Sequence, residues 1–187
     1  MIISIGGYMG SGKSTVAKML AEKLGWPRYY IGGIRREKAR ERGLTLAEYN
    51  KLGEADPTTD LEVDQYQQEL GKREDNFIIE GRTSWYFIPH SLKIYLDVDE
   101  RIGAERIYND LQSSDKRNED SAPKNVEDIL ESIRNREKSD AMRYEKYYEI
   151  DAYDSRNYDF VVDTTDLTKD QVFDKVYAFV KERLDNN

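Results

Sequence analysis

The stretch IISIGGYMGSGKSTVAKMLAEKLGW, residues 2–26, joins an apolar run to a glycine-rich segment and then to a helical pattern. Residues 7–14 match G-x-x-x-x-G-K-[S/T], and they stand where that motif requires, after a strand and before a helix. Glycine costs backbone entropy wherever it is placed, so a cluster of glycines needs a reason. A phosphate-binding loop explains the cluster, because its main-chain N–H groups turn inward around a polyphosphate in conformations that side chains would obstruct. The stretch therefore predicts a nucleoside triphosphate site.

The chemistry of this motif assigns roles to individual residues. The following helix aims its positive N-terminus at the bound anion. The Lys13 ammonium reaches the outer phosphates and is a catalytic residue, while the Ser14 hydroxyl suits Mg²⁺ and is the expected metal ligand. The residues expected to bind the triphosphate are Gly7, Gly10, Ser11, Gly12, Lys13, Ser14 and Thr15.

Composition limits the other possibilities. The 187 residues fit one domain, and a formal net charge of -8 argues against binding to DNA or RNA polymers, which needs a basic surface. With no cysteine, the chain has neither a disulfide framework nor a thiolate nucleophile. No apolar run is long enough to span a membrane and no signal peptide is visible, so we expect a soluble, cytoplasmic protein.

Strand-like runs alternate with helical ones along the chain. The expected strands are residues 2–5, 28–31, 76–80, 92–98 and 159–164, and the first, third and fifth read as covered on both faces. Capping-box spacing at Thr45, Thr59 and Thr168 predicts helix starts, Gly25 ends the first helix, and residues 126–148 read as one long helix. This alternation predicts an α/β fold with a doubly wound parallel sheet of about five strands.

Arginines near the expected carboxyl ends of strands suggest a second, anionic ligand. Arg35 and Arg36 follow the second strand and Arg82 follows the third, where open α/β sheets bind their ligands. A solvated or ion-paired arginine is the alternative for the first two; Arg82, after a glycine at the end of a buried strand, is the stronger candidate.

Arg136, Asp140 and Arg143 share one stripe of the long helix. They fit either an ordinary intrahelical ion pair or a lid that closes over the transferred phosphoryl group, with residues 112–124 as its hinge.

In these features the chain resembles the cytidylate kinases, especially the short archaeal ones. The resemblance is carried by the glycine-rich motif and by GGIRREKARERG, EADPTTD, IIEGR, LKIYL, AERI and REKSDAMRYEKYYEIDAYD. It implies a P-loop NTPase three-layer sandwich in a single kinase domain, residues 1–187. The implied parts are a core (1–31, 76–111 and 151–187), a helical monophosphate-binding insert (32–75) and a helical lid region (112–150).

The resemblance also implies site residues. Arg36 and Arg82 match arginines that hold the acceptor phosphate, and Arg106 and Arg136 match catalytic arginines of the lid region. Asp140 and Arg143 match a pair near the acceptor nucleotide, the first as an acceptor ligand and the second as a catalytic group. Residues 163–167, DTTDL, match the loop that borders the donor adenine.

Several positions depart from that family. Gln65 and Tyr66 replace a pair of arginines, and Tyr8-Met9 stands where the family has Pro-Pro. Thr83 replaces an aspartate that helps to read cytosine in bacterial enzymes, and Ile31 replaces a serine.

The leading hypothesis is phosphoryl transfer from Mg²⁺-bound ATP to a nucleoside monophosphate, with CMP preferred and dCMP or UMP as further acceptors. Such an acceptor is already ionised, so no general base is needed. A small-molecule hydroxyl kinase is the alternative; the usual acid at the end of strand two is missing, although Asp64 or Asp97 could substitute. A nucleotide-binding regulator with a degenerate acceptor site is the third hypothesis.

Two further points stay open at this stage. Glu80 either orients a metal-bound water or serves as a capping or ion-paired acid. The sequence gives no preference between a monomer and a weak dimer.

Overall fold

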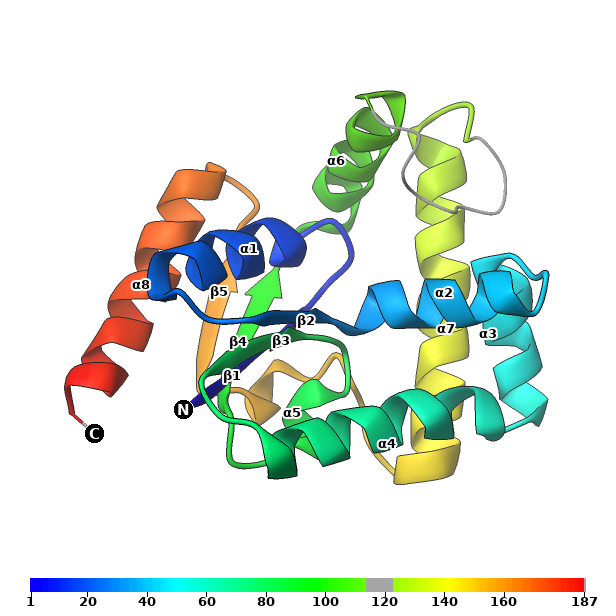
Figure 1. Ribbon diagram of the computed structural model, residues 1–187. Coiled ribbons are helices and arrows are strands. Elements are labelled where there is room, and N and C mark those ends of the chain that lie inside the picture. The colour runs from blue at the N-terminus through cyan, green and yellow to red at the C-terminus, as the bar shows by residue number, and fades with distance from the viewer. Residues whose placement is uncertain (114–122, 187) are drawn as a thin grey trace.

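A five-stranded parallel sheet forms the centre of the molecule (Figure 1). The computed structural model describes residues 1–113 and 123–186. The strands are β1 (Ile2–Gly7), β2 (Arg28–Tyr30), β3 (Phe77–Glu80), β4 (Leu92–Asp97) and β5 (Phe160–Asp163), in the order β2-β3-β1-β4-β5. All four neighbouring pairs are parallel, so the predicted α/β sheet is confirmed.

Eight α-helices connect and cover these strands in the described part of the chain. They are α1 (Lys13–Leu24), α2 (Ile31–Glu41), α3 (Leu46–Ala55), α4 (Thr58–Arg73), α5 (Ser84–Phe87), α6 (Glu100–Ser113), α7 (Val126–Tyr148) and α8 (Lys169–Asp185). A single 3₁₀ turn, η1 (Ser155–Asn157), precedes β5. The long helix has the bounds that the sequence predicts: the Asn125 side chain caps its first turn, and Glu149 ends it in the left-handed conformation, with φ +55°.

The sheet lies between two helical layers. On one face α1 and α8 pack on the strands through a cluster that includes Ile3, Leu20, Ile94 and Val176, and on the other α4 and α5 lie below the strands (Figure 1). The second face is sealed by Phe77, Ile79 and Ile88 among others. Every residue of β1 and β3 is buried, and burial on both faces explains their continuous runs of isoleucine and phenylalanine, which only Ser4 and the terminal Glu80 and glycines depart from.

Two details of the sequence prediction are wrong. The fifth strand is not covered on both faces: β5 is the edge strand, and Val161 is 45% exposed. Thr59 does not open a capping box, because α4 begins one residue earlier, where Asp56 accepts the Thr58 N–H at 2.9 Å. The boxes at Thr45 and Thr168 are confirmed.

Helices α2, α3 and α4 are inserted between β2 and β3, and α6 and α7 follow β4. Helix α7 packs along α6 and α3, so it spans from one group of helices to the other (Figure 1). A third apolar cluster joins Met9, just after β1, to Ile107 of α6 and to Ile129 and Ile133 of α7. The elements thus surround the carboxyl ends of the strands, where a ligand site is expected.

We predict that Gly7→Ala unfolds or severely destabilises the protein, whereas Gly25→Ala does not. Gly7 has φ +133°, and a Cβ there would lie 2.1 Å from the Leu96 carbonyl oxygen, so the loss in the free energy of unfolding should be about 3 kcal/mol or more. Gly25 has φ +68° and open space around it, so left-handed strain alone should cost about 1–2 kcal/mol. Urea denaturation measures both, and equal losses would contradict this account.

Candidate active site

A cavity of about 410 Å³ opens at the carboxyl ends of the strands. Its walls come from the glycine-rich loop after β1, the starts of α1 and α2, the segment after β3, and helices α4, α6 and α7. Seven basic side chains of the described residues line it, against three acidic ones. The basic set is Lys13, Arg35, Arg36, Arg82, Arg106, Arg136 and Lys169, and the acidic set is Asp64, Glu80 and Asp110. In a protein of net charge -8, this local excess of cations marks an anion site.

The glycine-rich loop has the conformation that its sequence predicts. Gly10 and Gly12 adopt φ +80° and +86°, and Gly12 caps α1 without any side-chain hydrogen bond to the first turn. The helix N-terminus is therefore open towards the cavity. Every residue predicted to bind the triphosphate lines the cavity except Gly7, which ends β1.

The Lys13 ammonium lies against main-chain oxygens of the loop. It donates to the carbonyls of Gly7, at 2.9 Å, and Tyr8, and lies 3.4 Å from Ser11 Oγ. This places a cation inside the loop, beside the positions where its N–H groups would meet phosphate oxygens.

Ser14 and Glu80 present oxygen ligands at one wall of the cavity. Glu80 is 3% exposed, and its Oε1 has no hydrogen bond but lies 3.4 Å from Arg28 Nη2. Burial raises the pKa of Glu80, and Ser14 and Arg28 oppose that effect. A hydroxyl beside a buried, under-satisfied carboxylate fits the oxygen donors that Mg²⁺ prefers. No cluster of three or more metal-ligating side chains occurs among the residues that the structure describes.

Arg106 reaches from α6 to the segment after β5. Its guanidinium donates to the Thr164 hydroxyl at 3.1 Å and to the carbonyls of Thr164, at 2.8 Å, and Thr165, at 3.1 Å. It therefore fixes the loop that the sequence places beside the donor base. Its catalytic role stays a prediction.

Arg82 and Arg36, the arginines predicted to hold the acceptor phosphate, both line the cavity. Arg82 Nε lies 2.9 Å from Asp140 Oδ2 and donates to the Tyr153 hydroxyl at 2.8 Å. Burial alone would lower the pKa of Arg82, but Asp140 and Tyr153 outweigh it and raise that pKa. Arg36 donates to the Tyr30 hydroxyl at 2.5 Å and to the Gly32 carbonyl at 3.1 Å.

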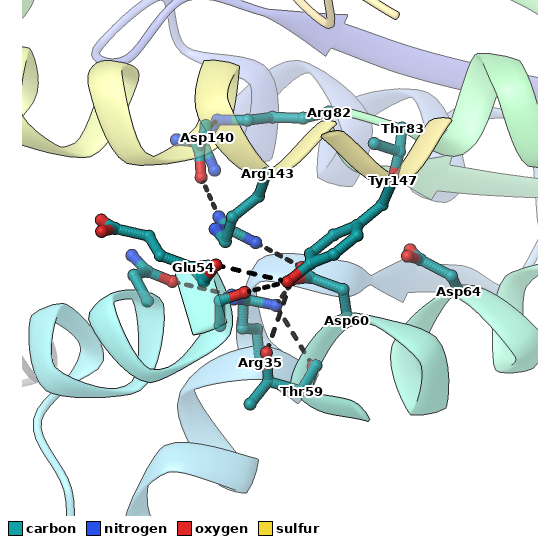
Figure 2. Close-up of polar contacts among 12 residues, drawn as sticks. Arg35, Glu54, Thr59, Asp60, Asp64, Arg82, Thr83, Asp140, Arg143 and Tyr147 are labelled. Atoms are coloured by element: carbon teal, nitrogen blue, oxygen red, sulfur yellow. Dashed lines mark hydrogen bonds and ion pairs between the residues drawn. The ribbon is translucent and has the colours of Figure 1, made fainter. Parts of the chain in front are cut away.

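Asp140 and Arg143 belong to a buried ion-pair network instead of lining the cavity (Figure 2). Arg143 is fully buried and pairs with Asp140 of its own helix and with Asp60 of α4. Asp60 also pairs with Arg35 Nη1 at 2.7 Å. The network ties α2, α4 and α7 together, and through Asp140 it positions Arg82. The predicted direct contacts of Asp140 and Arg143 with substrate remain untested.

Arg136 contrasts with its neighbours on α7. It lines the cavity, no ion pair joins it to any carboxylate of the described residues, and its Nε is buried without a hydrogen-bond partner. Burial, and next the positive charge of Arg82, lower the pKa of Arg136 to about 10. A guanidinium desolvated in this way needs an anion. Of the stripe predicted from the sequence, Arg136 is the member best placed to meet a phosphoryl group.

Asp64 places a buried carboxyl group in the wall of the cavity. It lines the cavity, is 5% exposed, and accepts hydrogen bonds from Gln67 Nε2, at 3.1 Å, and from the Tyr148 hydroxyl. Burial is the main cause that raises the pKa of Asp64 to about 7, and nearby Asp60 adds to it. Gln67 also donates to Thr83, which lines the same wall.

Other contributors were not singled out from the sequence. Asp60 lies four residues before Asp64, a spacing that puts both on one face of α4 and could have been noticed. Tyr153 donates to Asp140 Oδ2 at 3.0 Å and accepts from Arg82, but it follows the last turn of α7 in a loop, where no pattern marks it. Residues 114–122 of the predicted hinge lie outside the described residues.

The fold and this cavity define a P-loop kinase. The chain matches the model of the cytidylate kinase-like family over residues 2–166. It is 41% identical to a cytidylate kinase of Methanocella arvoryzae over 165 residues, covering 88% of each chain. It is 37% identical to a cytidylate kinase of Pyrococcus furiosus over 187 residues, covering 100% of this chain and 89% of the relative. The protein belongs to the cytidylate kinase-like family and is an enzyme of the nucleoside monophosphate kinase class.

Solved structures agree on the fold. An uncharacterized protein from Eubacterium ventriosum superposes with a TM-score of 0.67 at 20% identity, covering 97% of this chain and 98% of its own. Shikimate kinase from Bacteroides thetaiotaomicron gives 0.65 at 14% identity with the same coverage. At these identities the likeness concerns the fold alone. Within the described part of the chain, none of the helices has the length and apolar character required to cross a membrane.

We predict opposite effects on stability for two arginines of α7. Arg143→Met should lower the free energy of unfolding by about 3 kcal/mol or more, because it leaves Asp60 and Asp140 with less compensating charge. Arg136→Met should leave it unchanged or raise it, because the lost guanidinium has no ion pair among the described residues and its Nε is buried without a hydrogen-bond partner. Urea denaturation in phosphate-free buffer compares the two, and a large loss for Arg136→Met would contradict its assignment.

A pH prediction concerns Asp64. Its pKa in the folded protein, about 7, lies above the unfolded value of about 4. The stability that protonated Asp64 contributes is therefore complete below about pH 4 and is lost as the pH rises to about 7, so the free energy of unfolding falls over that range. Asp64→Asn should remove that loss, so the variant should gain up to about 4 kcal/mol on the wild type between pH 4 and 8.5.

Denaturant unfolding at several pH values measures this gain for Asp64→Asn. Asp166→Asn, at an exposed position, is the control and should track the wild type. A pH-independent difference between Asp64→Asn and the wild type would refute the assignment.

Proposed function

We propose that this enzyme transfers the terminal phosphoryl group of Mg²⁺-bound ATP to CMP, with dCMP and UMP as further acceptors. The single observation that carries the proposal is the excess of basic over acidic side chains around one cavity. The cations come from different segments: Lys13 from the glycine-rich loop, and Arg36 and Arg82 from the segments that follow β2 and β3. Two anionic ligands account for these seven cations of the described residues better than one.

Arg136 supports transfer between those two ligands. It comes from α7, which packs against both α6 and α3, and its side chain enters the cavity with no carboxylate paired to it. Charge neutralisation and positioning suffice for transfer to a phosphate, because that acceptor is ionised at neutral pH.

When bound, Mg²⁺ would neutralise the donor phosphates, and Ser14 with the Glu80 carboxylate would hold it or its waters.

The choice of CMP rests on the relatives and on the acceptor end of the cavity. The curated relatives named above are cytidylate kinases. Of the two residues that replace the family's arginine pair, neither lines the cavity, and Tyr66 packs its ring on Tyr29. Arg36, Arg82 and Arg136 then supply the acceptor's countercharge. Asp64 and Thr83 are the polar groups that a base would meet.

A hydroxyl acceptor is the second candidate, and Asp64 is the observation that favours it. A cavity-lining carboxyl group with a pKa of about 7 has the properties of a general base for a hydroxyl. Asp97, the other acid considered, does not line the cavity. The number of arginines around a single small pocket favours a phosphorylated acceptor over a neutral one.

The test is a coupled assay of ADP formation with each common nucleoside monophosphate and with a panel of hydroxyl acceptors. We expect turnover with CMP, weaker turnover with dCMP and UMP, and none with hydroxyl compounds. Lys13→Met should lower kcat by about 100-fold or more, because it removes a cation from the reacting phosphates.

Lys18→Met, on the exposed face of α1, is the matched control and should retain activity. Turnover with a hydroxyl compound alone would replace the proposal by its rival. ATP binding without any acceptor would indicate a regulatory protein.

A further inference from the structure

The loop that binds the donor phosphates is attached to the helices that cover the cavity. Gly10 approaches α6 so closely that a Cβ there would lie 2.2 Å from the Gly103 carbonyl oxygen. Met9 is buried with Ile107 of α6 and Ile133 of α7. These are apolar and main-chain contacts, which hold the helices near the loop but do not fix the rotation of α7.

Tyr8 adds a directional contact to α7. Its hydroxyl donates to Glu137 Oε2 at 2.8 Å, across 129 residues of sequence. Burial, and next the Glu137 carboxylate, raise the pKa of Tyr8, so the hydroxyl keeps its proton and remains a donor. A hydrogen bond to an ionised acceptor is among the stronger kinds.

The Tyr8–Glu137 hydrogen bond affects Arg136, because Glu137 is its neighbour on α7. Glu137 follows Arg136 directly, so the two side chains leave α7 about 100° apart. Glu137 faces the loop, while Arg136 lines the cavity. Holding Glu137 against the loop therefore restrains, one residue away, the direction in which the Arg136 guanidinium projects, in addition to the Arg134–Glu100 and Arg143–Asp60 ion pairs of the same helix. No carboxylate of the described residues is ion-paired with that guanidinium.

Tyr8 also reaches the acceptor side. Its ring packs edge-on against Tyr153, with centroids 5.9 Å apart. The Tyr153 hydroxyl contacts both Arg82 and Asp140. One residue of the donor loop is thus connected to Arg136 through Glu137 and to Arg82 through Tyr153.

We propose that the Tyr8–Glu137 hydrogen bond is a latch between the donor loop and α7 that positions Arg136 for phosphoryl transfer. Tyr8 and Glu137 are positioning residues and touch neither substrate. This inference rests on the proposed function, because the role of the latch is to place a guanidinium on the transferred group.

Kinetics of latch variants test the proposal. Tyr8→Phe and Glu137→Ala should each lower kcat by about tenfold, since a charge-assisted hydrogen bond is lost, while the Kd of Mg²⁺-bound ATP and the acceptor KM change by less than about threefold. The double variant should be no slower than either single one, because both remove the same interaction. Glu137→Gln retains an acceptor oxygen and should be intermediate.

Tyr29→Phe is the matched control. Tyr29 also donates to a glutamate, Glu74 Oε2, at 2.5 Å, but neither residue lines the cavity. Its kcat should equal that of the wild type. Additive losses in the double variant, an unchanged or raised kcat in Tyr8→Phe, or an equal loss in Tyr29→Phe would overturn the latch.

Hydrogen exchange of α7 separates failure of the latch from failure of the proposed function. Without the latch, amides around residues 133–140 should exchange faster in Tyr8→Phe than in the wild type or in Tyr29→Phe. If the wild type phosphorylates no acceptor, the proposed function fails, and with it the catalytic purpose of the latch, whatever the exchange shows. If the wild type is active and exchange in Tyr8→Phe is unchanged, only the latch is refuted.

Discussion

Two buried carboxylates, Asp60 and Asp140, allow several guanidinium groups to share one small volume. Asp60 pairs with Arg35 and Arg143, and Asp140 pairs with Arg143 and Arg82. Without these anions the cations would repel one another in a region of low dielectric constant, and their desolvation would oppose folding. The arrangement of α2, α4 and α7 around the cavity therefore depends on these pairs as much as on apolar packing.

The same network leaves Arg136 without an ion pair among the described residues, although Asp140 partly offsets its charge. Arg136 lies within reach of the positive field of Arg82, and its lowered pKa records the cost. A protein that fully balanced its cations would have no affinity left for the phosphate of a ligand. A destabilising cation at one position, which an anionic ligand would balance, is the common trade-off at functional sites.

Local patterns in the sequence identify the glycine-rich loop and most of the arginines that line the cavity, but not the buried ion pairs that hold them. Neighbours within a few positions determine the glycine-rich loop, the helix ends at Gly25, Thr45 and Thr168, and the 23 residues of α7. The edge position of β5 does not, because an apolar run reads alike at the centre and at the border of a sheet. Asp60 meets Arg143 across 83 residues, and Tyr8 meets Glu137 across 129. Such pairings depend on how helices pack, which no local pattern encodes.

Tyr8 and Met9, the two variable residues in the middle of the phosphate-binding motif, make contacts to the helices that cover the cavity. The motif constrains its glycines, its lysine and its serine through the geometry of phosphate binding, and leaves the intervening positions open. In this chain Met9 joins the apolar cluster of α6 and α7, and Tyr8 donates to Glu137. Positions that phosphate binding leaves unconstrained can therefore determine how the covering helices are held. Because those helices carry Arg106 and Arg136, a substitution that touches no ligand can still change the charge that the ligand meets.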